Sequence, residues 1–164
     1  MKSRLDWPKA APGVAQVLIG LQTVVNDSGL EPALLELVKL RASQVNGCGF
    51  CIDMHTKDAR AAGETEQRLY LLDAWREAAH LYSERERAAL AWTEAVTNIA
   101  VGHAPDEVYE DVRAQFADAE LVKLTLAIVS INGWNRLNIA FRTPAGNYKP
   151  GMFNHAKPVT LQPG

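Results

Sequence analysis

Apolar side chains recur at helical spacing along most of this chain. From Pro12 onward the apolar positions follow one another three or four residues apart, and similar runs lead from Pro32 to Asn46 and from Cys48 to Gly63. This spacing places apolar side chains on one face of a helix. Proline suits the first helical turn, whereas glycine favours a helix end. The pattern therefore predicts three consecutive amphipathic helices.

The second half of the chain continues the helical pattern. We expect a short helix over residues 64–75 and a longer one that begins at the capping box Ser83-x-x-Glu86. Pro105 marks another helix start, because acidic residues follow it and complement the positive helix end. No repeating alternation of apolar and polar residues predicts a strand.

Residues 121–141 are the most apolar segment. A helix that is apolar on most sides is buried in a core or against another subunit. Polar residues interrupt the segment, so it does not read as a membrane span. These residues are Lys123, Asn132, Asn135, Arg136 and Asn138.

The two ends of the chain differ from its helical middle. Residues 1–11 read as an irregular lead-in. Residues 143–164 contain half of the eight prolines, which predicts a tail that is disordered or lies as an arm on a neighbouring subunit. We expect residues 1–164 to form one all-α domain with its core at about residues 10–142.

Composition and charge narrow the range of partners. The formal net charge of −2 gives no basic surface of the kind that binds nucleic acid or membranes. The N-terminus lacks the apolar stretch of a signal peptide, which favours a cytoplasmic location. In such a reducing compartment, a close cysteine pair is more typical of catalysis or metal binding than of a structural disulfide.

The chain's two cysteines stand three residues apart, and a histidine follows four residues later. At about 100° per residue, Cys48, Cys51 and His55 fall within about 60° of one another on one helix face. The opposite face carries Asp53, Lys57 and Arg60. Two thiols and an imidazole therefore share one apolar face.

Glu36, on the preceding helix, is the fourth member of the set. If the two helices fold back antiparallel about Asn46-Gly47, Glu36 lies level with about residue 57, roughly one helical turn from His55. A thiolate is a nucleophile, and both a helix N-terminus and a proton acceptor favour its formation. The second thiol can then convert the oxidised first one into a disulfide. The set suits thiol redox chemistry.

The spacing of Glu36, Cys48, Cys51 and His55 resembles the core of alkylhydroperoxidase D (AhpD). AhpD belongs to the all-helical carboxymuconolactone decarboxylase-like superfamily. The flanking stretches LLELVKLRASQVNGCGFC and MHTKDARAAGET are similar to the same group. The motif covers about residues 34–64, and the family's helical unit would cover most of residues 10–142.

This resemblance implies an AhpD-like helical bundle built around the hairpin that carries Cys-x-x-Cys. It also implies a peroxidase without cofactor or metal, in which Cys51 is oxidised by a hydroperoxide and Cys48 closes the disulfide. Glu36 and His55 would relay the proton, and an external dithiol protein would reduce the disulfide. The family's habit of oligomerising, together with the apolar segment 121–141, predicts a trimer or hexamer.

One position departs from the family pattern. Well-studied members carry a histidine just before the second cysteine, where this chain has Phe50.

Helix physics alone favours Cys48 as the first sulfur to react, because it is nearer the positive helix end and more exposed. Proximity to His55 favours Cys51, which is our choice.

Other interpretations of the same residues remain open. Cys48, Cys51, His55 and Glu36 could be four zinc ligands, or the cysteines could be two buried apolar side chains. A carboxymuconolactone decarboxylase-type lyase would need no cysteine pair. A non-catalytic redox sensor would keep the pair but turn over slowly.

A few further residues give weaker signals. We interpret Arg41 as a snorkelling edge residue rather than a partner of Glu36. Asp58 could orient His55 but is expected to be solvated. Core or interface packing is expected for Trp134, Asn135 and Arg136. The histidines without a motif, expected at the surface or in loops, are His80, His103 and His155.

Overall fold

The computed structural model describes residues 2–153, and every regular element among them is helical. The elements are α1 (Trp7–Ala10), α2 (Pro12–Asn26), α3 (Pro32–Asn46), α4 (Gly49–Ala61), α5 (Glu66–Leu71), the 3₁₀ turns η1 (Leu72–Ala74) and η2 (Ala79–Leu81), α6 (Glu84–Thr97), α7 (Asp106–Arg113) and α8 (Asp118–Phe141). The all-α prediction is confirmed. None of the helices described is both long enough and apolar enough to cross a bilayer.

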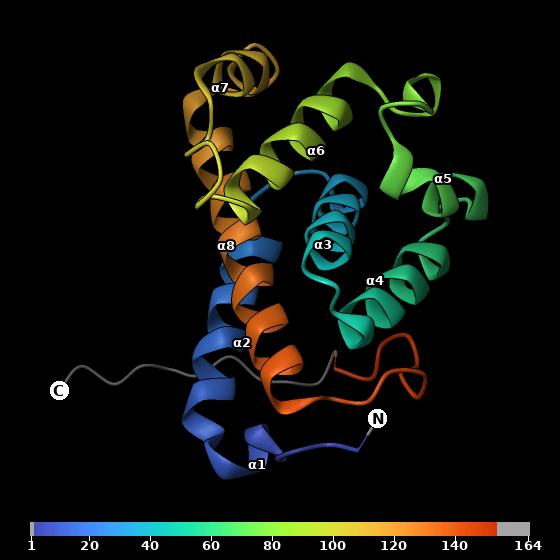
Figure 1. The fold of residues 1–164 in the computed structure, drawn as a ribbon, viewed down its shortest axis with the longest axis vertical. Helices are drawn as coiled ribbons and strands as arrows, with labels where there is room; N and C mark the ends of the chain where they lie inside the picture. Colours follow the sequence, from blue (N-terminus) through green and yellow to red (C-terminus); the bar gives the residue numbers. More distant parts are fainter. Residues whose placement is uncertain (1, 154–164) are drawn as a thin grey trace, which may run out of the picture.

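Helix α3 is the central element of the fold. It packs against α4, α6 and α8, while α2 lies along α8 and α7 packs on α6 (Figure 1). The side chains of α3 enter two hydrophobic clusters: Leu34 and Val38 join the one formed with α6 and α8, and Leu37 and Leu40 join the one formed with α4 and α5. α3 therefore joins both hydrophobic clusters and packs directly on α4, the helix at the cysteine pair.

Local capping rules explain where the main helices begin and end. Pro32 opens α3, and Gly47 closes it with a φ of 69°, a left-handed conformation that glycine adopts without strain. The Ser83 hydroxyl accepts the Glu86 N–H at 3.2 Å, and the Glu86 carboxylate accepts the Ser83 N–H at 2.8 Å, which completes the predicted capping box.

The N-terminal lead-in is more ordered than expected. Residues Trp7–Ala10 form a short helix, and the Asp6 side chain accepts the Lys9 N–H. Trp7 is buried and packs on Trp134, with ring centroids 5.9 Å apart. The prediction of an irregular segment is wrong here because one buried aromatic contact, invisible to periodicity, orders the turn.

The segment after α8 also differs from its prediction. Residues 143–153 lie on α4 of their own chain: the Asp53 carboxylate accepts the Gly146 N–H at 2.9 Å, and Lys57 Nζ donates to the Tyr148 carbonyl at 3.0 Å. The Tyr148 hydroxyl donates to Asp58 at 2.8 Å, so Asp58 is not merely solvated. Residues 154–164, with His155, lie outside the described residues.

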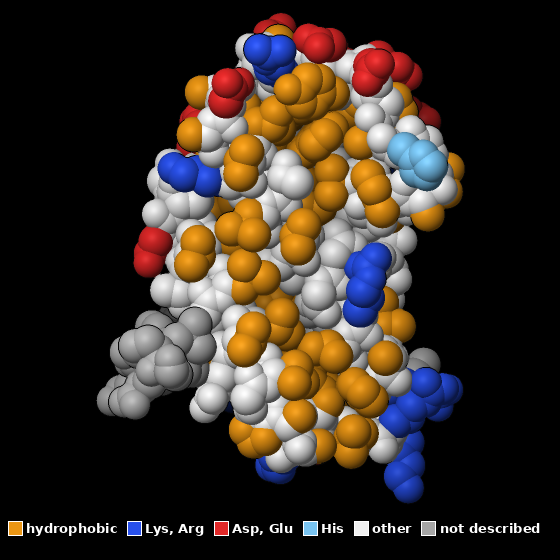
Figure 2. All heavy atoms as spheres, turned by 90° about the vertical axis from the view of Figure 1, so that its left-hand side faces the viewer, with side chains coloured by type: hydrophobic (Ala, Val, Ile, Leu, Met, Phe, Trp, Pro, Cys, Tyr) orange, Lys and Arg blue, Asp and Glu red, His pale blue; other side chains and the backbone are white. Residues whose placement is uncertain are grey.

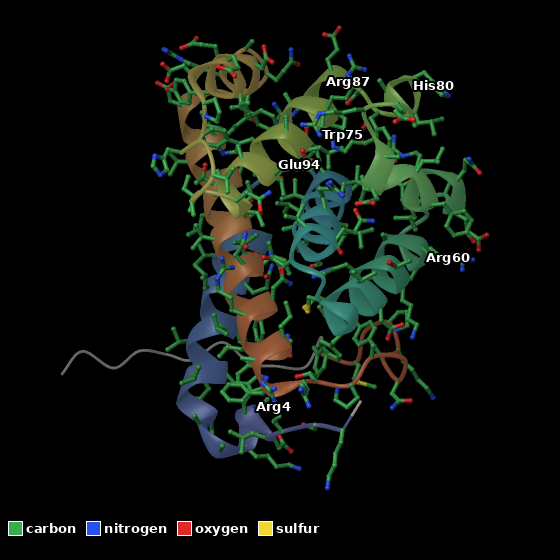
Figure 3. All side chains as sticks on the ribbon, in the orientation of Figure 1. Arg4, Arg60, Trp75, His80, Arg87 and Glu94 are labelled. Atoms are coloured by element: carbon green, nitrogen blue, oxygen red, sulfur yellow. A yellow bond between two sulfur atoms is a disulfide. The ribbon has the colours of Figure 1, made fainter. Side chains whose placement is uncertain are left out.

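Arg41 pairs with a carboxylate other than that of Glu36. Its side chain is 12% exposed, and its Nε donates to Glu94 Oε1 at 2.8 Å. Trp75 Nε1 donates to the same oxygen at 2.8 Å, and Figure 3 shows Trp75 and Glu94 close to one another. Arg41 is thus a half-buried ion-pair partner that joins α3 to α6. Snorkelling is the wrong interpretation.

The remaining polar positions divide between surface and core. His80 is exposed at the edge of the molecule, where Figure 3 labels it, and His103 is exposed in the loop before α7. Asn135 is fully buried, as expected of a packing residue. Arg136 is exposed and donates to the Asn132 side chain at 2.7 Å, so it does not pack in the core of its own chain, and interface packing stays a prediction for it.

Candidate active site

The turn between α3 and α4 places both cysteines at the start of α4. Cys48 is the N-cap, one residue before the helix, and its sulfur accepts the Cys51 N–H at 3.4 Å. The two residues form a disulfide, with Cα atoms 5.3 Å apart. Cys48 is 1% exposed and Cys51 is 0% exposed, so the greater exposure expected for Cys48 is not observed.

The neighbouring face of α4 presents His55 to α3. His55 is 5% exposed and lies one helical turn after Cys51. Its Nδ1 lies 2.9 Å from Glu36 Oε2, across the hairpin. The structure therefore brings Glu36 and His55 together, as the antiparallel arrangement of the two helices predicted.

Lys39 completes this group, and the sequence argument did not identify it. Lys39 is 6% exposed, and its Nζ donates to Glu36 Oε1 at 2.7 Å. One Glu36 oxygen thus binds the lysine, and the other binds His55. The i to i+3 spacing of Glu36 and Lys39 on one helix was the available signal.

The charge on Glu36 follows from these contacts. Burial opposes its ionisation, but the hydrogen bonds and charges of His55 and Lys39 outweigh burial and lower the pKa of this carboxyl to about 2. An ionised carboxylate only accepts hydrogen bonds, so His55 Nδ1 carries the hydrogen. His55 Nε2 is buried and has no hydrogen-bond partner among residues 2–153. This ring nitrogen is thus left without a contact among these residues that would fix its role.

Asn138, near the end of α8, contacts the cysteine pair from the other side. Its Nδ2 lies 3.7 Å from Cys51 Sγ, within donor distance for sulfur. Asn138 also borders a cavity of about 380 Å³ between α4 and the end of α8. The cavity is lined by Gly47, Cys48, Gly49, Phe50, Asn138, Ile139, Arg142, Thr143, Pro144 and Ala145. Its wall includes Cys48, whereas Cys51 lies behind that wall.

A buried amide network holds the end of α3 against α8. Asn135 Oδ1 accepts from Asn46 Nδ2 at 2.9 Å, and Asn135 Nδ2 donates to Ser43 Oγ at 3.1 Å. Because Asn46 immediately precedes the Gly47 turn, this network fixes where the hairpin sits relative to Asn138. The sequence predicted a turn at Asn46 and packing for Asn135, but it did not identify the hydrogen bond between them.

A second, smaller hollow reaches the acidic end of the site. It measures about 170 Å³ and is lined by Ala33, Glu36, Leu37, Ala59, Ala62, Gly63 and Glu64. The Glu36 side chain is 20% exposed, and it borders this hollow. No group of three or more His, Cys, Asp or Glu side chains within residues 2–153 is arranged to hold a metal ion.

The sequence is similar to one protein family and to several individual proteins. The sequence model of the carboxymuconolactone decarboxylase family matches residues 12–95. The uncharacterised protein YdfG of Bacillus subtilis is 42% identical over 147 residues, which cover 90% of this chain and 99% of YdfG. The alkyl hydroperoxide reductase AhpD of Bradyrhizobium diazoefficiens is 39% identical over 46 residues, 28% of this chain and 25% of that protein.

Solved structures share the whole fold. A protein of unknown function from Agrobacterium tumefaciens, described as a candidate AhpD antioxidant defence protein, superposes with a TM-score of 0.86 at 46% identity. The alignment covers 90% of this chain and all of that one. The debrominase Bmp8 has a TM-score of 0.75 at 19% identity over 85% of this chain and 74% of its own. That likeness concerns the fold alone, and the reaction must be argued from the site.

The low pKa of Glu36 predicts how stability depends on pH. Its stabilising contribution is fully present above the carboxyl's ordinary pKa of 4.5 and is lost as pH falls towards 2. A shift of this size corresponds to about 3 kcal/mol. Between about pH 5 and pH 2, the free energy of unfolding should therefore decrease less steeply in Glu36→Gln than in the native chain. Urea denaturation at each pH measures this free energy. Glu107→Gln, at an exposed carboxylate on α7, is the matched control. Equal slopes for the two variants would contradict the assignment.

Proposed function

The chain belongs to the carboxymuconolactone decarboxylase family, and we propose that it is an AhpD-like thiol peroxidase that works without a cofactor. One observation carries this proposal: the buried Cys48–Cys51 pair lies between a cavity and the hydrogen-bonded Glu36–His55 pair. The candidate AhpD function of the Agrobacterium protein and the local similarity to AhpD itself support it.

In the first step, the thiol of Cys51 gives its proton to His55. The Glu36 carboxylate, kept ionised by Lys39, stabilises the imidazolium that forms. The Cys51 thiolate attacks the terminal oxygen of the hydroperoxide, and the O–O bond breaks. The leaving alkoxide takes the proton from His55 and departs as an alcohol. Cys51 is left as a sulfenic acid.

In the second step, the Cys48 thiol attacks the sulfenic sulfur. The S–O bond breaks, water leaves, and the Cys48–Cys51 disulfide forms. A dithiol protein then reduces the disulfide by thiol exchange, becoming a disulfide itself. Cys48 borders the cavity, so we expect the exchange to begin there. Such a reductant is kept reduced in the cytoplasm, where we place the chain.

Asn138 adds a donor to this scheme. Its amide contacts Cys51 Sγ, and a hydrogen bond to the ionised form of a group favours that form. The Asn138 side chain also borders the cavity in which a hydroperoxide would lie. With Phe50 in place of the family's histidine, the relay here consists of His55 and Glu36.

Turnover with a dithiol tests the function. Reduced protein, supplied with excess dithiothreitol and cumene hydroperoxide, should consume many equivalents of peroxide per subunit. The fall in peroxide concentration over time measures this consumption. Cys51→Ser should abolish this consumption. A single equivalent consumed would indicate a redox sensor instead. Loss of a muconolactone acid without peroxide, in the same protein, would indicate the decarboxylase.

Sulfenic-acid trapping tests the order of the two sulfurs. After one equivalent of peroxide, Cys48→Ser should accumulate a labelled sulfenic acid at Cys51, because the resolving thiol is gone. Cys51→Ser should show almost no fast oxidation at Cys48, which lies one turn farther from His55. Mass spectrometry of labelled peptides measures both. The opposite pattern would reverse the two roles and leave the peroxidase activity standing.

We also propose that the chain forms a homo-trimer or homo-hexamer through the face where α2 and α8 lie. Figure 2 shows apolar side chains running along the length of this face. The exposed apolar residues of the two helices include Val14, Val17, Val24, Val122 and Val129. Contiguous apolar surface of this extent typically marks a protein interface.

Light scattering at micromolar concentration measures the assembly. We expect a trimeric or hexameric mass for the native chain. Val17→Glu, at a side chain that is 65% exposed on α2, should yield a smaller species, because it would bury a charge in the interface. Tyr70→Glu, at a 68% exposed residue on α5, should leave the mass unchanged. A native monomer would refute the proposal.

A further inference from the structure

The cavity beside Cys48 has apolar walls and one charged side chain. Phe50, Ile139, Pro144 and Ala145 provide most of the walls. Arg142 is the charged residue among those that line the cavity, and no carboxylate lines it. A cavity of this composition suits a ligand that combines an apolar body with an anionic group.

Arg142 occupies an unusual backbone position for its residue type. It is the C-cap of α8, with φ and ψ of 55° and 53°, in the left-handed region. Glycine usually takes this position because it has no side chain to strain the backbone. The turn alone therefore does not account for an arginine, whereas a need for its side chain at the cavity does.

The guanidinium of Arg142 is also uncommitted. The residue is exposed, and within residues 2–153 its side chain makes no hydrogen bond or salt bridge. By contrast, Arg41, Arg68 and Arg85 each bind carboxylates of the chain itself. A guanidinium with no partner among the described residues, at the edge of an apolar cavity, can bind a carboxylate through two parallel hydrogen bonds.

We propose that this cavity binds organic hydroperoxides that carry a carboxylate, with Arg142 as the carboxylate-binding residue. The inference rests on the proposed peroxidase function and names its substrate class. Phe50 and Ile139 contact the apolar body of such a substrate. Cys48 and Asn138 line the same cavity and both contact Cys51, so a molecule held by Arg142 lies beside the cysteine pair, with Cys48 at the wall and Cys51 directly behind it.

The cavity volume agrees with a substrate of modest size. About 380 Å³ lies at the small end of the range of roughly 300–1,000 Å³ typical of small-molecule sites. Cumene hydroperoxide and its para-carboxylate derivative are both small organic molecules and differ only in the charged group. The pair therefore isolates the contribution of Arg142.

The first test compares kcat/KM for these two hydroperoxides. The native protein should prefer the carboxylate compound by about tenfold or more, since hydrogen bonds to a charged group contribute on this scale. Arg142→Gln should bring the ratio close to one, and Arg142→Lys should retain part of the preference. Arg113→Gln, at an exposed arginine on α7, should keep the native ratio. Equal use of both compounds by the native protein would overturn the proposal while leaving the peroxidase standing.

The second test does not depend on turnover. Calorimetry of the disulfide form should detect binding of 4-isopropylbenzoate that is at least about fivefold tighter than binding of the neutral 4-isopropylbenzamide. Arg142→Gln should remove this difference. If it does so in a protein that turns over no hydroperoxide, the anion site stands and the peroxidase proposal fails. Equal binding of both compounds would overturn the anion site.

Discussion

The buried Lys39–Glu36–His55 group constrains the rest of the site. A charged carboxylate away from water is costly unless its oxygens are paired, and both are paired here, one within α3 and one across to α4. This pairing requires the two helices to meet in one register. The left-handed turn at Gly47 sets that register, and the packing of α3 into both hydrophobic clusters holds it.

Two hollows lie at the two ends of the candidate site. The larger cavity reaches the cysteine end, and the smaller hollow reaches Glu36. The two hollows therefore border different parts of the candidate site. The sulfurs have mostly apolar surroundings, whereas the pairs with Lys39 and His55 stabilise the ionised Glu36 carboxylate.

Segments distant in sequence decide access to the sulfurs. The end of α8 supplies Asn138 beside Cys51, and the chain from Arg142 to Ala145 forms the cavity wall opposite Cys48. Contacts of Gly146 and Tyr148 with α4 hold this wall in place. The candidate reactive atoms thus come from one hairpin, and part of their surroundings comes from the C-terminal part of the described chain.

The sequence by itself determined the main helices and the central residues of the candidate site. Helical periodicity, proline and glycine boundaries and the hairpin turn act over a few residues, so they placed Cys48, Cys51, His55 and Glu36 together. Tertiary structure alone decided the partners of Arg41 and Asp58, the position of Asn138 and the order of residues 143–153. Asn138 lies 87 residues from Cys51, and Tyr148 lies 90 residues from Asp58. Such pairs form only when whole helices pack, and no local periodicity encodes which distant side chains then meet.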